Sequence, residues 1–261
     1  MDIKLKWIGG ATLILKIDNL KIACDPVLCN EGTIHDYRYF KTKRLNNPIF
    51  DESDFENVNI WLLTHNHEDH IDKLGFEKID CNTTIVSHKS LKPLFKEDIF
   101  KNLNYLDLEE SFIYTNNDIS IKIKALLAIH AKRNFFGRQI GNGNGYLLEI
   151  IKDDLKYTVY VTGDSVFNVD IKKYFDNLKI DLIITNAGNA MIGNSIMAKL
   201  IGRITNNIGD IKKMIAVLNP KIVIPVHWGT FTHYTELIDI DSFANYNQVK
   251  LINPGQTINL W

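Results

Sequence analysis

Charged and apolar side chains alternate along the first seven residues of the chain, which is typical of a half-buried strand. Residues 3–7, 12–17 and 20–24 are three short apolar-rich segments that each favour a strand. Gly9-Gly10 and Asp18-Asn19 separate these segments and favour turns. The pattern therefore predicts that the chain begins as a meander of three short strands.

The rest of the chain mixes strand and helix patterns. Strands are predicted at residues 60–63, 84–87, 119–129, 145–151, 157–161, 180–185, 221–226, 249–252 and 257–260. Helices are predicted at residues 73–79, 91–95 and 235–246. A further helix is predicted with Asp210 as its N-cap and Asn219-Pro220 at its end.

Two segments carry no single interpretation. Residues 29–54 lack a clear period and hold aromatic and cationic side chains, so they form either a functional loop or a solvated connection. In residues 186–204, a loop precedes a helix-compatible apolar stripe at 194–204. That stripe is either part of the core or the lid of a pocket.

Composition narrows the class of protein. The chain has 261 residues, of which 45% are hydrophobic and 23% are charged. This composition is ordinary for a soluble globular protein, and we expect residues 1–261 to form a single domain. A net charge of -1 favours a small-molecule substrate over nucleic acid or an anionic membrane. No run has the length of a membrane span or signal peptide, and the three cysteines form no Cys-x-x-Cys pair. A reducing, cytoplasmic location is expected.

The densest chemistry follows the predicted strand at residues 60–63. His65, His67, Asp69 and His70 lie within six consecutive positions. Imidazole nitrogen and carboxylate oxygen are the ligands that zinc, iron and manganese accept. Because positions two apart diverge on a helix, His65 and His67 converge only in an irregular loop that leaves a strand. We interpret this segment as a metal-binding loop.

Further candidate ligands stand at the ends of three other predicted strands, namely His130, Asp164 and His227. Seven side chains suffice for two metal sites. We expect His65, His67 and His130 to hold one ion and Asp69, His70 and His227 to hold the other, with Asp164 as the bridge. Zinc is the first expectation for both ions, and manganese and iron suit the same ligands.

Two adjacent divalent ions favour hydrolysis. Such a pair lowers the pKa of a bridging water towards about 7 and polarises the bond under attack. The metal-bound hydroxide is then the nucleophile, so neither a serine triad nor a reactive cysteine is required. Asp69 is the expected catalytic residue, because it would also orient the hydroxide.

The ligand pattern His65-x-His67-x-Asp69-His70, with His130, Gly163-Asp164 and His227, resembles that of the metallo-β-lactamase superfamily. Residues 7–12, 23–28 and 225–230 extend the resemblance to the branch of ascorbate-6-phosphate lactonases and N-acylphosphatidylethanolamine phospholipase D-like proteins. It spans nearly the whole chain. The resemblance implies an α+β fold, a four-layer αββα sandwich with a dinuclear site at one edge. At position 10, where the branch often has a histidine, this chain has glycine.

The resemblance implies a lactone or a phosphodiester as substrate, with the anionic group of the family's phosphorylated substrates. Candidate residues for holding such a substrate are Arg133, Arg138, Asn186 and His233. The alternative for each is an ordinary surface role. The loops around Arg38, Phe135 and Met191 are where we expect the choice of substrate to be made.

Two other functions fit the same ligands. One is a non-haem iron oxidoreductase of the same fold. The diiron enzymes resemble a His-x-Glu-x-Asp pattern, whereas this chain has His67 at the central position. The other is a non-catalytic, metal-stabilised binding protein, which the retention of all seven ligands disfavours.

Overall fold

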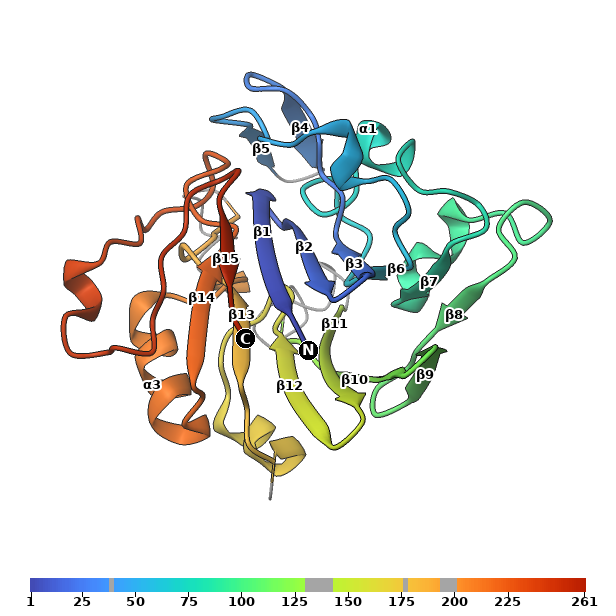
Figure 1. Cartoon of the computed structure of the whole chain (residues 1–261). Helices are drawn as coiled ribbons and strands as arrows, with labels where there is room; N and C mark the ends of the chain where they lie inside the picture. Colours follow the sequence, from blue (N-terminus) through green and yellow to red (C-terminus); the bar gives the residue numbers. More distant parts are fainter. Residues whose placement is uncertain (38–39, 130–142, 176–177, 193–200) are drawn as a thin grey trace.

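The computed structural model of the chain describes residues 1–37, 40–129, 143–175, 178–192 and 201–261. Two β-sheets pack face to face, and helical segments cover their outer faces (Figure 1). These four layers form the α+β sandwich that the sequence predicts. Among the helices of the described residues, none combines the length and apolar character needed to cross a bilayer.

The first sheet is built from the N-terminal meander and the strands that follow it. Its strands, in spatial order, are β15 (Thr257–Asn259), β1 (Ile3–Gly9), β2 (Thr12–Ile17), β3 (Leu20–Cys24), β6 (Ile60–Leu63), β7 (Thr84–Ser87) and β8 (Leu103–Tyr105). Strands β1 to β3 pair antiparallel, whereas β3, β6, β7 and β8 pair parallel. The carboxyl ends of β3 and β6 therefore lie side by side.

The second sheet contains the hairpin around Asp153-Asp154. Its strands, in spatial order, are β14 (Ile222–Val226), β13 (Leu182–Asn186), β12 (Leu155–Val161), β11 (Asn144–Lys152), β10 (Ile119–Leu127) and β9 (Ser111–Asn116). Strands β12, β13 and β14 are parallel, so their carboxyl ends meet at one edge.

The core consists of three apolar layers. Side chains such as Leu5, Leu15, Ile121, Leu148 and Val159 fill the space between the sheets. Outside the first sheet lie α1 (Lys73–Phe76), η1 (Glu52–Asp54) and η2 (Lys89–Leu94), and outside the second lie α3 (Ile208–Leu218) and η4 (Val169–Phe175). A further single turn, η5 (Asp241–Phe243), precedes the C-terminal segment.

Residues 29–54 do not form a continuous loop. They contain the antiparallel hairpin of β4 (Ile34–Tyr37) and β5 (Phe40–Lys43), which pairs with neither main sheet and lies next to α1 in Figure 1. The side chains that this hairpin turns inward include His35 and Thr42, which are buried but polar. Hydrophobic alternation, the usual sign of a strand, is therefore missing from the sequence.

Three predicted helices differ from the observed ones. Asp210 is not the N-cap of α3: the cap is Asn207, whose side chain accepts from the Asp210 amide at 2.8 Å, and Asp210 completes the capping box. Residues 91–95 lie within the 3-10 helix η2, which contains Pro93. Only the turn η5 forms within residues 235–246, where Asp239 accepts from the Ser242 amide.

The predicted strand at residues 249–252 is wrong, because only a single bridge joins Val249 to Val223. The predicted strand at residues 119–129 is confirmed as far as Leu127. Most of the apolar stripe at 194–204 lies outside the described residues. Cys24, Cys29 and Cys81 are free thiols, in agreement with the absence of a predicted disulfide framework.

Candidate metal centre

The loop that leaves β6 is fixed at both ends. Thr64 donates its amide to Asp25 Oδ1 at 2.8 Å. Asp72 accepts from the Gly75 amide at 2.7 Å and so caps α1, while its second oxygen accepts from the amides of Leu28 and Cys29 at 2.8 and 2.6 Å. The histidines and acids between these anchors therefore have a defined backbone.

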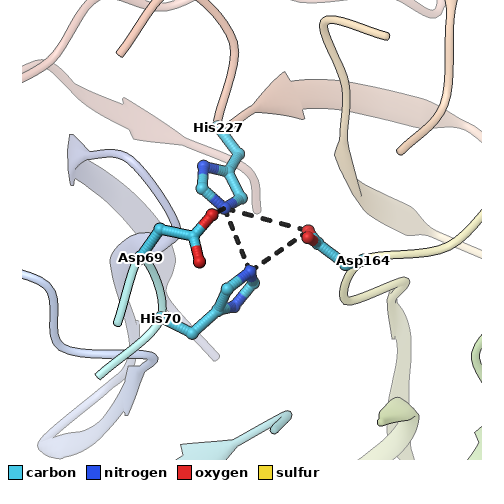
Figure 2. A group of neighbouring side chains, drawn as sticks. All are labelled: Asp69, His70, Asp164 and His227. Atoms are coloured by element: carbon cyan, nitrogen blue, oxygen red, sulfur yellow. Dashed lines mark hydrogen bonds and ion pairs between the residues drawn. The ribbon is translucent and has the colours of Figure 1, made fainter. Parts of the chain in front are cut away.

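Four ligand atoms converge at the edge where the strands of both sheets end. Asp69 and His70 come from the loop after β6, Asp164 follows β12 and His227 follows β14. One ligand atom from each lies within 4.8 Å of the others, and all four residues are buried (Figure 2). His70 Nε2 lies 3.0 Å from His227 Nε2 and 3.2 Å from Asp164 Oδ1, while Asp69 Oδ2 lies 4.0 Å from His227 Nε2.

His65 and His67 form a second group beside this cluster. His65 Nε2 lies 3.0 Å from His67 Nδ1, and the His65 and His70 rings are 4.0 Å apart between centroids. The structure thus brings together six of the seven predicted ligands. The seventh, His130, lies outside the described residues.

Each of the four clustered ligands also has a partner outside the cluster. His70 Nδ1 lies 2.8 Å from Asp25 Oδ2, and Asp69 Oδ1 accepts from the Tyr37 hydroxyl at 2.9 Å. Asp164 Oδ1 accepts from the Asn186 amide at 2.8 Å, and the Tyr234 hydroxyl lies 2.8 Å from His227 Nε2. Such partners fix the direction in which a ligand atom points.

Burial and neighbouring charge set the protonation of these groups. Burial lowers the pKa of His227 to about 3, so its imidazole is neutral and has a lone pair to offer. Burial alone would lower the pKa of His70 too, but the charges of Asp164 and Asp25 raise it well above the usual value. Burial opposes ionisation of Asp69, yet the hydrogen bond from His233 and the charge of His70 hold its pKa well below normal. Burial, with the charge of Asp69, raises the pKa of Tyr37, so the phenol keeps its proton and can donate a hydrogen bond to Asp69.

Strained backbone accompanies the site. His227 has φ of 69° and Asp25 has φ of 40°, both in the left-handed region that non-glycine residues rarely adopt. Gly163, with φ of 57°, precedes Asp164, and a Cβ there would stand 2.7 Å from the Asn144 carbonyl oxygen. Only glycine fits the turn that brings Asp164 to the cluster.

The substrate candidates occupy different positions. The amide of Asn186 donates to Asp164, and His233 lies between Thr42 Oγ1, 2.7 Å from its Nδ1, and Asp69 Oδ2, 3.5 Å from its Nε2. Both therefore contact predicted ligands in this structure. Arg133 and Arg138 lie outside the described residues.

Three residues at the site were not among the predicted ones: Asp25, Tyr37 and Tyr234. Asp25 gave a local signal, because it is an acid directly after the predicted strand at residues 20–24, much as Asp164 follows the predicted strand at residues 157–161 by three positions. Tyr37 and Tyr234 gave no such local signal. The partner of Tyr37 is 32 positions away, and the partner of Tyr234 is seven positions away in an irregular segment.

The donor set fits a divalent metal. Imidazole nitrogens and carboxylate oxygens are buried together at spacings that a shared cation can bridge. Burying so many polar groups close together costs free energy, which a bound cation would offset. Zinc, manganese and iron all accept these donors.

Comparison with known proteins agrees with the fold and with a metal-dependent hydrolase. A metal-dependent hydrolase of Caldivirga maquilingensis is 22% identical over 264 residues, covering 98% of this chain and 97% of the relative. One from Pyrococcus horikoshii is 24% identical over 268 residues, covering 99% of this chain and all (100%) of the relative. The crystal structure of isothiocyanate hydrolase from Delia radicum gut bacteria superposes with a TM-score of 0.79 at 19% identity, covering 98% of each chain.

The family model described as the beta-lactamase superfamily domain matches residues 4–227, which include all seven predicted ligands. The names of the relatives above specify neither a lactone nor a phosphodiester, so the finer placement in the lactonase and phospholipase D-like branch stays a prediction. The match covers most of the chain, and the fold and the ligand cluster agree with it. The chain therefore belongs to the metallo-β-lactamase superfamily.

Proposed function

We propose that the chain is a metal-dependent hydrolase that cleaves a small ester-like bond, in a lactone or a phosphodiester, at a dinuclear centre. One observation carries the proposal. Asp69, His70, Asp164 and His227 converge in a buried cluster, and the His65 and His67 pair lies directly beside it. A closed structural site needs four ligands for one ion, whereas six side chains gather here.

The positions of the described ligands support the division that the sequence predicts. His65 and His67, with His130 as predicted from the sequence, would hold one ion, and Asp69, His70 and His227 the other. Asp164 Oδ1 lies 3.2 Å from His70 Nε2 and would bridge the two. Two divalent ions would supply an activated water and polarise the bond under attack.

The protein's own contribution is orientation. The Tyr37 hydroxyl holds Asp69 Oδ1, which leaves Oδ2 facing His227 and His233. In that position, Asp69 would accept a hydrogen bond from the water that the metal centre activates, and so would orient that water towards the substrate. Asp25 and Asn186 fix His70 and Asp164 in the same manner.

The relatives support hydrolysis as the reaction class. Those from Caldivirga maquilingensis and Pyrococcus horikoshii are both called metal-dependent hydrolases and align over nearly their full lengths. A protein of the same fold is called an isothiocyanate hydrolase, so an isothiocyanate is worth testing beside the esters.

The experiment combines metal analysis with a substrate screen. The wild-type protein, purified without added metal, is assayed with a bis-aryl phosphodiester, an aryl lactone and an alkyl isothiocyanate. His67→Ala is the test variant, because His67 belongs to the predicted ligand set and is half-buried at the edge of the site. We expect turnover of at least one substrate by wild type, and loss of both metal and turnover in the variant.

Two outcomes contradict this proposal. Unchanged metal content in His67→Ala would show that the ligand assignment is wrong. Full metal content in wild type, with no turnover of any substrate in the panel, would favour the binding-protein alternative instead.

A further inference from the structure

The β4–β5 hairpin connects two of the three loops that carry the clustered ligands, the loop after β6 and the loop after β14. On one side, β5 runs beside residues 230–232, downstream of His227: Lys43 and Thr232 exchange hydrogen bonds, and Leu45 donates to the Thr230 carbonyl at 2.8 Å. On the other side, β4 reaches the loop after β6, where Tyr37 contacts Asp69. The hairpin thus spans ligands supplied by both main sheets.

Tyr37 is the residue of β4 that meets the metal centre. Its hydroxyl donates to Asp69 Oδ1 at 2.9 Å. Its ring stacks on Phe40 of β5, with centroids 4.9 Å apart and planes inclined by 15°, and meets the edge of the His67 ring at 6.1 Å. Because packing holds the ring from two sides, the hydroxyl has little freedom to leave Asp69.

The second oxygen of Asp69 is also connected to the hairpin. Thr42 of β5 lies with its Oγ1 2.7 Å from His233 Nδ1, and His233 Nε2 lies 3.5 Å from Asp69 Oδ2. Thr42 and His233 are both buried. The hairpin therefore contacts one Asp69 oxygen directly and the other through an imidazole.

The hairpin is anchored independently of these contacts. Arg44, directly after β5, is fully buried, and its guanidinium carbon lies 5.0 Å from the centre of the Phe231 ring. Its Nε donates to the Asn46 carbonyl at 2.9 Å. A change in the Tyr37 hydroxyl alone is consequently expected to leave the hairpin in place.

We propose that the β4–β5 hairpin sets the orientation of Asp69, and that Tyr37 is the positioning residue through which it does so. This role rests on the proposed metal centre. Without the Tyr37 hydroxyl, Asp69 Oδ1 loses this hydrogen bond, and the longer contact of Oδ2 with His233 is left to oppose rotation of the carboxylate about its terminal bond, which is a broad torsion with no strong preference of its own. The ion that Asp69 holds then loses a fixed ligand, while the ion held by His65 and His67 does not.

The test measures zinc affinity in Tyr37→Phe. Metal-free protein is titrated with zinc in competition with a chromophoric chelator, and far-UV circular dichroism checks the fold. Loss of a group that orients a metal ligand typically lowers the affinity for the metal about 10- to 100-fold. We expect a loss of this size for one zinc ion and an unchanged affinity for the other.

Tyr157→Phe is the matched control. Tyr157 is a buried tyrosine in β12, and its hydroxyl has no hydrogen-bond partner in the structure. We expect this variant to bind both zinc ions as wild type does. Thr42→Val removes the hydroxyl that contacts His233. We expect it to lower the affinity for the same zinc ion as Tyr37→Phe does, by a smaller factor.

The result that overturns the positioning role is equal affinity of Tyr37→Phe and wild type for both ions. That result leaves the hydrolase proposal standing. Conversely, zinc binding without turnover in wild type would contradict the hydrolase proposal. The role of Tyr37 would then be decided by the zinc titration alone. The two failures are therefore distinguishable.

Discussion

His70 points its Nε2 into the ligand cluster because Asp25 holds the opposite nitrogen, at 2.8 Å from Oδ2. Asp25 is fixed in turn by Thr64, whose hydroxyl donates to the same oxygen at 2.6 Å and whose amide donates to the other. Strands β3 and β6 are parallel neighbours whose last pair is Cys24 with Leu62, so Asp25 and Thr64, one and two residues beyond that pair, come close together. The relationship follows from the sheet order.

Asp25→Asn tests this relationship. Asparagine has nearly the same shape and tolerates the left-handed backbone of residue 25, where φ is 40°. It lacks the charge that favours a proton on His70 Nδ1, so the ring loses its preferred tautomer and orientation. We expect metal affinity to fall about 10- to 100-fold by chelator competition. Wild-type affinity in the variant would contradict a role for Asp25 in orienting His70.

Gly163→Ala tests whether the turn before Asp164 requires glycine. The added Cβ would stand 2.7 Å from a backbone oxygen of Asn144, at a φ of 57°. We expect a loss of about 1–3 kcal/mol in the free energy of unfolding, measured with denaturant, together with reduced metal content. Gly209→Ala in α3 is the control: its Cβ would meet only the end of the Asn207 side chain, at 3.3 Å. Equal stability of Gly163→Ala and Gly209→Ala would argue against the requirement.

Asn186→Leu separates two roles for this residue. If Asn186 positions Asp164, through the 2.8 Å hydrogen bond that it donates, the variant loses metal affinity by about tenfold or more. If Asn186 instead contacts only the substrate, the variant raises KM and keeps wild-type metal affinity. The geometry favours the first outcome, and a zinc titration beside steady-state kinetics distinguishes them.

Asp18 provides a pH-dependent contribution to stability far from the centre. Its carboxylate accepts from the Asp2 amide at 2.7 Å and from Lys152 at 2.9 Å, and these bonds lower its pKa. Because the pKa is lower in the folded state, the stabilisation is present above the unfolded pKa of about 3.9 and is lost as the pH falls through the folded value. Asp18→Asn should therefore lower the free energy of unfolding at pH 7 by up to about 1 kcal/mol.

The same comparison in acid provides the check. Below the folded pKa, the carboxyl group of Asp18 is protonated and uncharged. The difference in unfolding free energy between Asp18→Asn and wild type should therefore vanish. Asparagine retains the turn, since residue 18 has φ of 50°. A difference in unfolding free energy that stays constant between pH 7 and acid would contradict the assignment of the effect to the charge of Asp18.

Much of the fold was visible in the hydrophobic pattern. The meander, the hairpin around Asp153-Asp154 and the buried strands that end in ligands were predicted, because each has one or two apolar faces. The edge strand β9 was not, since its apolar Ile113 is exposed and its alternation is therefore misleading. The hairpin β4–β5 was missed for the opposite reason, because it buries polar side chains such as His35.

The site was predictable in its ligands but not in the groups around them. His65 to His70 are dense in the sequence, and Asp164 and His227 each follow a predicted strand, so topology alone brings them to one edge. Tyr37 and Asn186 act on ligands 32 and 22 positions away, and no local pattern encodes such pairs. Their roles depend on how the sheets and the hairpin pack.

The most direct test of the central claim is the metal-to-protein ratio of wild-type protein purified without added metal and then equilibrated with zinc. Elemental analysis gives this ratio without reference to any substrate. A dinuclear centre built from these ligands predicts two metal ions per chain. A folded sample that retains no metal after equilibration with zinc would contradict it.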